Sequence, residues 1–271
     1  MTERPDTTFA GSIPEIYEQF AVPVVFQPYA NDLVSRVAHR RLTSVLEIAA
    51  GTGVLTRALA CALPDSVDIV ATDLNQPMLD QAASRPIARP VVWQQADAMA
   101  LPYQDDRFDA VLCQFGVMFF PNRAGGFAEA RRVLSPDGVF AFNAWDRVEE
   151  NDLAAAVTAA LADIFPTDPP QFMARTPHGY ADTARIGRDL QSAGFQNPPQ
   201  VTTVTLRGRA ETAQQAAIAY CQGTPFRAEI EARDPGGLER VTEAVAAAIS
   251  DQFGSVNLDT KLQAHVILVE K

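Results

Sequence analysis

The sequence predicts an α/β fold built on a doubly wound, mostly parallel sheet of seven strands. Residues 43–145 alternate short apolar runs with amphipathic segments, which is the pattern of successive βαβ units. The short runs are apolar on both faces, as expected for a sheet covered by helices on each side. A chain of 271 residues is long enough for one large α/β domain and short for two complete ones.

The first half of the chain supplies a helical arm and five strands. The arm covers residues 14–40 and is expected to be interrupted at Pro23 and Pro28. The expected strands cover residues 44–50, 68–74, 91–98, 108–115 and 139–145, and the helices between them cover residues 54–63, 76–84 and 123–134. Pro64 ends the first of these helices, and the Ser-Pro-Asp-Gly sequence at 135–138 predicts a turn after the third.

The second half has weaker signals. Residues 152–165 and 183–193 are expected to be helical, with a proline-rich loop at 166–177 between them. Residues 201–207 alternate like a strand, and residues 264–270 form the expected closing strand. Between these two strands, residues 211–253 contain at least two helices separated at 234–237. The seven-stranded sheet therefore carries a helical insertion before its last strand.

Composition excludes several classes of partner. The net charge of −11 and the absence of Lys/Arg runs make nucleic acid a poor partner. Cys61, Cys113 and Cys221 are far apart, without the spacing of a zinc site, so we expect free thiols and no metal. The polar N-terminus lacks a signal-peptide pattern, and no window approaches the ~20 apolar residues of a membrane span. These features predict a cytoplasmic protein without a membrane span.

The turn after the first strand suggests a ligand site. Residues 47–53 (EIAAGTG) lead from the strand into a helix through small residues, which let the backbone approach a ligand closely. A dinucleotide fingerprint, GxGxxG, needs a small residue three positions after its second glycine. That position holds Thr56 or Val54, depending on the register, so a pyrophosphate site is disfavoured.

The next two strands end in acids at the same edge of the sheet. Asp73 at the tip of the second strand can accept hydrogen bonds from both hydroxyls of a ribose. Asp97 and Ala98 at the tip of the third strand can meet an adenine edge. Taken singly, Asp73 is as well explained as a solvated turn acid, and the small residues as a tight turn. Their order on three successive strands favours a nucleoside site at the carboxyl edge of the sheet.

The segments VLEIAAGTG, ATDLNQPML, ADAMALPYQDDRFDAVLCQFGVMF and EARRVLSPDGVFAFNAW carry a family resemblance. They resemble class I S-adenosylmethionine-dependent methyltransferases, particularly the ubiquinone/menaquinone-biosynthesis C-methyltransferases and related small-molecule enzymes. The similarity is strongest over residues 43–146, weaker through Phe195 and thin beyond. It implies a Rossmann-like methyltransferase fold and S-adenosyl-L-methionine as cofactor.

The resemblance also implies which residues meet the cofactor. Glu47 organises the turn near the methionine amino group, Asp73 holds the ribose, and Gln114 lies beside the methionine part. The implied cofactor-binding residues are Glu47, Ala49, Ala50, Gly51, Gly53, Asp73, Leu74, Met78, Asp97, Ala98 and Gln114. Two positions depart from the family pattern. Ala49 replaces the first glycine of the turn, and Gln114 replaces the Asp or the Asn-Pro-Pro-Tyr motif of many N-methyltransferases.

Aromatic and sulfur-containing side chains predict an apolar acceptor pocket. The expected substrate-binding residues are Tyr17, Phe20, Phe115, Met118, Phe119, Trp145, His178 and Phe226. Such a wall favours an aromatic, planar acceptor over a sugar phosphate or an acidic metabolite. The simpler explanation for the aromatic residues of the arm is that they pack against the sheet. His178 and Asp146 are the candidate catalytic bases, whereas His39 and His265 are interpreted as structural or exposed.

We expect four segments of the chain to have different roles. Residues 1–40 form a helical cap arm, residues 41–146 the cofactor-binding core, residues 147–207 a substrate-side segment, and residues 208–271 a helical lid with the closing strand. The predicted activity is methyl transfer to a carbon, oxygen or nitrogen of a small acceptor, in a possible homodimer. The alternatives are a non-methylating reaction, such as cyclisation, decarboxylation or rearrangement, with the same cofactor, and a non-catalytic binding protein on the same fold.

Overall fold

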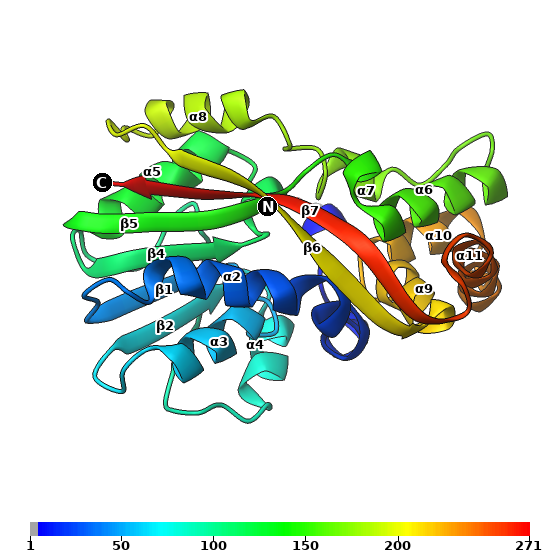
Figure 1. The fold of residues 1–271 in the computed structure, drawn as a ribbon, viewed down its shortest axis with the longest axis horizontal. Coiled ribbons are helices and arrows are strands. Elements are labelled where there is room, and N and C mark those ends of the chain that lie inside the picture. The colour runs from blue at the N-terminus through cyan, green and yellow to red at the C-terminus, as the bar shows by residue number, and fades with distance from the viewer. Residues whose placement is uncertain (1–4) are drawn as a thin grey trace.

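Seven strands form one sheet in the order β3-β2-β1-β4-β5-β7-β6 in the computed structural model, which describes residues 5–271 (Figure 1). The strands are β1 (Ser44–Ile48), β2 (Asp68–Asp73), β3 (Val92–Gln95), β4 (Phe108–Gln114), β5 (Leu134–Trp145), β6 (Gln200–Thr212) and β7 (Val256–Glu270). Neighbouring strands from β3 to β5 are parallel, and β7 runs antiparallel to both β5 and β6. This arrangement confirms the predicted fold class.

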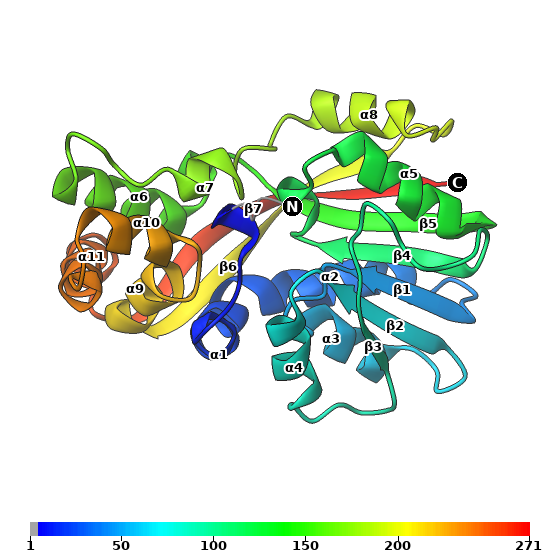
Figure 2. The same ribbon diagram turned by 180° about the vertical axis from the view of Figure 1, so that it is seen from behind.

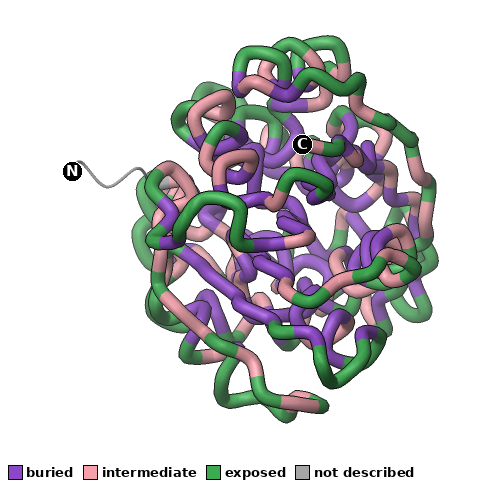
Figure 3. The backbone as a smooth tube through the Cα atoms, turned by 90° about the vertical axis from the view of Figure 1, so that its left-hand side faces the viewer, coloured by how far each residue is buried: buried purple, intermediate pink, exposed green. Residues whose placement is uncertain are grey.

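Helices cover both faces of the sheet because its strands are apolar on both sides. The helices of one face are α2 (Gln27–Val37) and α3 (Val54–Ala62), and those of the other are α5 (Arg123–Val133) and α8 (Thr183–Ser192). Successive residues of β1 show the division, since Val45 packs in one cluster and Leu46 in the other. In Figure 3 the buried backbone runs through the middle of the molecule and the exposed segments surround it.

Strands β6 and β7 are longer than the sequence predicts and make a continuous ribbon. They pair from Gln200 opposite Leu268 to Thr212 opposite Val256, whereas residues 201–207 and 264–270 were the expected strands. The extra length projects beyond the sheet toward a group of helices (Figure 1). This helical lobe consists of α6 (Asp152–Ile164), α9 (Ala213–Cys221), α10 (Phe226–Arg233) and α11 (Leu238–Phe253). A short helix, α7 (Phe172–Arg175), also interrupts the predicted proline-rich loop.

The N-terminal arm is continuous where the sequence predicts two interruptions. It passes from α1 (Ile13–Ile16) through a π-helical segment, η2 (Tyr17–Phe26), into α2. Pro23 lies inside the π-helical segment, whose wider turns accommodate a residue that cannot donate a backbone hydrogen bond. Pro28 occupies the first turn of α2, where the fixed φ of proline matches the helix. The expectation of breaks at both prolines is therefore wrong.

The predicted turn at residues 135–138 is also absorbed into a strand. β5 already begins at Leu134, which pairs with Phe108, and regular pairing resumes at Val139 opposite Ala110. The residues between form an irregularity in the ladder, as a β-bulge does. The sequence at residues 135–138 therefore marks a bulge within β5 and not the end of its pairing with β4.

Candidate active site

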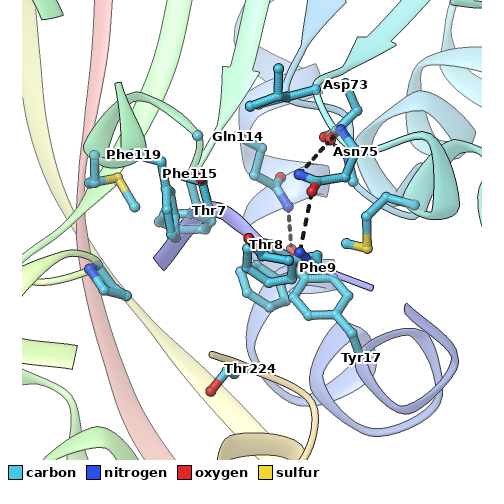
Figure 4. A pocket seen from close by; sticks show the side chains of 18 of the residues that line it. Thr7, Thr8, Phe9, Tyr17, Asp73, Asn75, Gln114, Phe115, Phe119 and Thr224 are labelled. Carbon is cyan, nitrogen blue, oxygen red and sulfur yellow. Dashed lines mark hydrogen bonds between the residues drawn. The ribbon is translucent and has the colours of Figure 1, made fainter. Parts of the chain in front are cut away.

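A cavity of about 820 Å³ lies at the carboxyl ends of the parallel strands. The tips of β1, β2 and β3 line one side of it, and residues near the helical lobe line the other. Figure 4 shows Asp73 and Asn75 on one side, Phe115 and Phe119 opposite, and Phe9 between them. This is the edge where open α/β sheets bind ligands, and the cavity is large enough for a nucleoside and a second small molecule.

The turn between β1 and α3 brings bare backbone to the cavity wall. Gly51 adopts a left-handed conformation with φ of 57°, and an added Cβ would lie 3.5 Å from the Met78 Cε atom. Ala49 has a φ of 54°, a region that costs a residue with a Cβ roughly 1–2 kcal/mol. The usual glycine at this position is explained by that conformation, so its replacement by alanine keeps the turn at a cost.

Asp73 is fixed at the tip of β2 by backbone donors. Its Oδ2 atom accepts a hydrogen bond from the Gly51 N–H at 2.8 Å, and its Oδ1 atom accepts one from the Asn75 N–H at 2.8 Å. Burial raises the pKa of Asp73, and these hydrogen bonds oppose the increase. The oriented carboxylate lines the cavity with lone pairs left over, which fits a pair of ribose hydroxyls.

Glu47 lies behind the turn and not on the cavity wall. The Thr56 hydroxyl donates a hydrogen bond to its Oε2 atom at 2.5 Å, and burial raises its pKa to about 8. Ala50 and Gly53 are also absent from the wall, and an added Cβ on Gly53 would lie 2.7 Å from the Trp93 ring. All three residues shape the turn, which is the role that the resemblance implied for Glu47, and their contact with the cofactor stays a prediction.

The remaining predicted cofactor residues line the cavity. The Asp97 Oδ1 atom accepts a hydrogen bond from the Met99 N–H at 2.8 Å, which holds the loop after β3 in place. Leu74, Met78 and Ala98 surround the same region. The Gln114 Nε2 atom donates to the Phe26 carbonyl at 3.3 Å, while its buried Oε1 atom has no partner among residues 5–271. An unpaired acceptor at this wall fits the ammonium group of a bound S-adenosylmethionine.

Aromatic rings form the wall beyond Gln114. The Phe115 and Trp145 rings are stacked, with centroids 3.8 Å apart and planes within 4°. Phe26 meets both rings edge-on, and Met118 and Phe119 extend the wall. The predicted apolar side chains after β4 and β5 thus line one side of the cavity, and their contact with an acceptor stays a prediction.

His178 is the polar group set into this aromatic wall. Its Nδ1 atom lies 2.6 Å from the Asp146 carbonyl oxygen, and its ring centroid is 6.0 Å from that of Trp145. A carbonyl only accepts hydrogen bonds, so Nδ1 carries the proton and Nε2 is the unprotonated nitrogen of the neutral ring. Burial lowers the pKa of His178 to about 4, against the opposing effect of the hydrogen bond to Asp146.

Three other predicted residues do not reach the wall. The Asp146 carboxylate accepts hydrogen bonds from the Gln263 amide and the Arg147 N–H, both at 2.7 Å, and lies 3.4 Å from His265 Nε2. Phe226 is buried behind the wall, with its ring 5.6 Å from that of Phe172, and Phe20 packs against the core. The Asp146 side chain is therefore not placed to act as a base, although its carbonyl orients His178.

Comparison with known proteins agrees with this geometry. A family model described as a methyltransferase domain matches residues 46–142, the part that holds the strand tips. A demethylmenaquinone methyltransferase of Lactobacillus johnsonii is 29% identical over 165 residues, covering 56% of this chain and 67% of the relative. The ubiquinone/menaquinone biosynthesis C-methyltransferase UbiE of Ectopseudomonas mendocina is 33% identical, over 50% of this chain and 63% of the relative. Residues 46–142 therefore form a methyltransferase domain that is distantly related to these C-methyltransferases.

The similarity to solved structures extends further along the methyltransferase than the sequence matches do. The YcgJ protein of Bacillus subtilis superposes with a TM-score of 0.58 at 19% identity, covering 90% of this chain and 98% of that one. At this identity the likeness shows the fold alone. The curated relatives above match over about two thirds of their length or less, and the helical lobe lies wholly outside the family model. S-adenosylmethionine is the methyl donor of the family.

A segment within the predicted cap arm of residues 1–40 crosses the cavity. Residues 6–10, the strap, run between the helical lobe and the sheet (Figure 2). Arg175 and Thr176 donate hydrogen bonds to the Asp6 carboxylate, and the Asn75 Oδ1 atom accepts one from the Phe9 N–H at 3.2 Å. The Phe9 ring lies edge-on to Tyr17, which lines the cavity as predicted.

Sequence reasoning also missed wall residues that come from the lobe side. They are Phe172, Met173, Ala219 and Tyr220. An alanine-rich helix and a proline-rich loop have no local signal that points to a ligand. Within residues 5–271, no helix is long and apolar enough to cross a membrane. No group of three or more His, Cys, Asp or Glu residues in that range is arranged to hold a metal ion.

Proposed function

We propose that this protein transfers the methyl group of S-adenosylmethionine to a small, uncharged acceptor with a planar apolar body. The observation that supports this most directly is the single cavity that joins the strand tips to the aromatic wall. Asp73, Gly51 and Gln114 would hold the cofactor on one side. The stacked Phe115 and Trp145 rings would receive the acceptor on the other.

Charge supports the choice of acceptor. Among the described residues that line the cavity there is no lysine or arginine, and its two carboxylates, Asp73 and Asp97, belong to the strand tips. A phosphate or carboxylate on the acceptor would find no cation in the wall. An ammonium group near the lobe would find no carboxylate. Burying an unpaired charge is costly, so an uncharged acceptor is favoured.

The proposed mechanism relies on alignment and on exclusion of water. The bound sulfonium supplies an activated methyl group, and the displacement requires the acceptor atom in line with the carbon–sulfur bond. Gly51 and Asp73 orient the ribose end, and the aromatic wall orients the acceptor ring. The strap covers the cavity between these two halves and keeps water from the developing charges. By this proposal, residues 41–146 bind the cofactor, and residues 147–271 together with the arm select the acceptor.

Replacing Gly51 tests the cofactor site. Gly51→Val adds branched atoms at the cavity wall and should abolish binding of S-adenosylhomocysteine in calorimetric titration. Gly236→Val is the matched control, because Gly236 also has a positive φ, 81°, yet nothing lies within 4 Å of an added Cβ. Both variants should lose similar stability. Normal binding by the Gly51 variant would refute the site.

Product analysis separates methyl transfer from the alternative reaction. Turnover of an accepted substrate should release one S-adenosylhomocysteine for each product, as detected by mass spectrometry. A product formed while S-adenosylmethionine stays intact would instead indicate a cyclisation, decarboxylation or rearrangement.

A further inference from the structure

We infer that the acceptor presents an un-ionised hydroxyl, conjugated to its planar ring, to the Nε2 atom of His178. This inference rests on the proposed function and names the chemical class of its substrate: a neutral phenol or enol. It assigns His178 as the residue that binds this hydroxyl and receives its proton.

The first support is that one ring nitrogen of His178 is free and faces the cavity. Nδ1 is taken by the Asp146 carbonyl, and none of the described residues bonds to Nε2. His178 lines the cavity, and Nε2 is not among the buried polar atoms that lack a partner. The free nitrogen is therefore accessible, and it has an acceptor lone pair and no proton to donate. Only a ligand that donates a hydrogen bond satisfies it.

The second support is that the ring is held rigidly. The Asp146 carboxylate is anchored to the Gln263 amide and the Arg147 N–H, which fixes the carbonyl of the same residue. His265 Nε2 lies 3.4 Å from that carboxylate, and its Nδ1 atom lies 3.0 Å from the Thr203 hydroxyl. Asp146 is thus a positioning residue. A fixed carbonyl keeps Nε2 aimed at one place, as an orienting group does for a catalytic imidazole.

The third support is the surroundings of Nε2. The Trp145 ring, whose centroid lies 6.0 Å from that of His178, is stacked on Phe115, so aromatic side chains border the histidine in the cavity wall. A planar ring lying on this wall can direct a substituent in its own plane toward Nε2. An anionic substituent would be repelled by the lone pair and would find no cation among the described wall residues.

The proposed methyl transfer moves one proton from the hydroxyl and one electron pair onto the methyl carbon. The hydroxyl proton passes to Nε2 while the acceptor's electron pair, on the oxygen or the conjugated carbon, bonds to the methyl carbon. The carbon–sulfur bond breaks and its electron pair stays on sulfur, which becomes a neutral thioether. The imidazolium then returns its proton to water. The depressed pKa of His178 suits a proton that leaves as the methyl bond forms, because a hydroxyl under methylation is far more acidic than a free one.

The test uses three probes that share one ring: 2-naphthol, naphthalene and 2-naphthoate. Their affinities are measured by fluorescence titration on the full chain saturated with S-adenosylhomocysteine. One added hydrogen bond should make 2-naphthol bind about three- to tenfold more tightly than naphthalene, and 2-naphthoate should bind most weakly. In His178→Phe the advantage of the hydroxyl should vanish. His39→Phe, the same substitution at an exposed histidine outside the cavity, should keep it.

A second measurement needs no variant. The chain has three histidines, so ¹⁵N-histidine spectra are simple to assign. The Nε2 resonance of His178 should move with 2-naphthol and stay unchanged with naphthalene. A hydroxyl preference that survives in His178→Phe, an unmoved resonance, or tighter binding of 2-naphthoate would overturn the inference. Failure to bind S-adenosylhomocysteine would instead refute the proposed function, so the two failures are distinguishable.

Discussion

Asp73 is the residue whose role the geometry restricts most. Its two oxygens hold the backbone of the turn and of Asn75, and they face the cavity. If they also accept both ribose hydroxyls, Asp73→Ala should weaken S-adenosylhomocysteine binding by roughly 2–4 kcal/mol in calorimetric titration.

Asp109 offers a matched control for that experiment. Its carboxylate likewise accepts hydrogen bonds from the backbone, at Thr43 and Ser44, but at the opposite edge of the sheet. Asp109→Ala should lower the melting temperature and leave the affinity for S-adenosylhomocysteine unchanged. Equal losses of affinity in the two variants would mean that Asp73 acts only through the fold.

Glu47 makes a pH-dependent contribution with a defined sign. Burial raises its pKa from 4.5 to about 8 in the folded state, so the folded chain keeps a proton that the unfolded chain loses. Below pH 4.5, Glu47 therefore does not lower the free energy of unfolding. As the pH rises from there to about 8, stability falls by up to about 1.4 kcal/mol per pH unit. Glu47→Gln keeps the acceptor for Thr56 and removes this penalty. Between pH 5 and pH 8, the free energy of unfolding measured in urea should rise for the variant relative to the wild type. Parallel pH profiles of this free energy would contradict the assignment.

For single residues, the sequence predicted the positions of those that belong to a motif. It missed the positions that depend on tertiary packing. Asp73, Asp97 and Gly51 follow strands at positions fixed by the βαβ pattern, so their convergence could be predicted. The burial of Glu47 behind the turn could not, because a strand residue may face either side of the tip. The carboxylate of Asp146 was misplaced for the same reason.

The strap is the element that joins the two halves of the cavity. Asp6 is bound to Arg175 and Thr176 near the lobe, and Phe9 to Asn75 at the sheet edge. Burial opposes ionisation of Asp6, but the bonds from Arg175 and Thr176 outweigh it and lower its pKa. The ion pair therefore persists down to pH values below 3.8, and the strap stays fastened across the physiological range.

Removing the contacts between Arg175 and Asp6 should increase the mobility of the strap more than that of the rest of the chain. Arg175→Ala removes the bonds to Asp6, so amide exchange in residues 6–10 should rise, and S-adenosylhomocysteine should dissociate severalfold faster. The control is Arg233→Ala, whose partner Asp168 lies in a loop outside the strap. Hydrogen-exchange mass spectrometry with and without S-adenosylhomocysteine measures both effects. Amide exchange rates in the strap that change with neither the mutation nor the ligand would show that this segment merely packs against the sheet.

Element boundaries were predictable where periodicity was strong. Strands β1, β2 and β4 follow largely apolar runs, whereas the outer halves of β6 and β7 alternate only weakly. In β7, for example, Leu258 and Leu262 are buried on either side of a buried Thr260. The polar threonine hid the alternation, although its hydroxyl is satisfied by the Gly208 carbonyl. Tertiary pairing decided the strand length there.

The whole molecule combines a strongly acidic chain with a cavity wall that is largely uncharged. The net charge of −11 resides mainly on the surface, since Asp73 and Asp97 are the carboxylates among the described residues of the wall. The sequence predicted this contrast through its aromatic residues, and it also predicted the fold class. It also predicted a cap arm at residues 1–40 and a lid at residues 208–271. It could not predict the contacts that hold the strap across the cavity, such as that of Asp6 with Arg175, because the two residues are more than 160 positions apart.

The pairing of Thr212 with Val256 has a consequence for how such a protein can diversify. The chain leaves the ribbon at Thr212 and returns to it at the neighbouring position, so residues 213–255 form one large loop whose ends are already adjacent. A loop with adjacent ends can be lengthened, shortened or exchanged at small entropic cost, without moving either strand. Three lobe helices and part of the cavity wall can therefore be replaced as one unit, while the strand tips on the other side of the cavity stay in register.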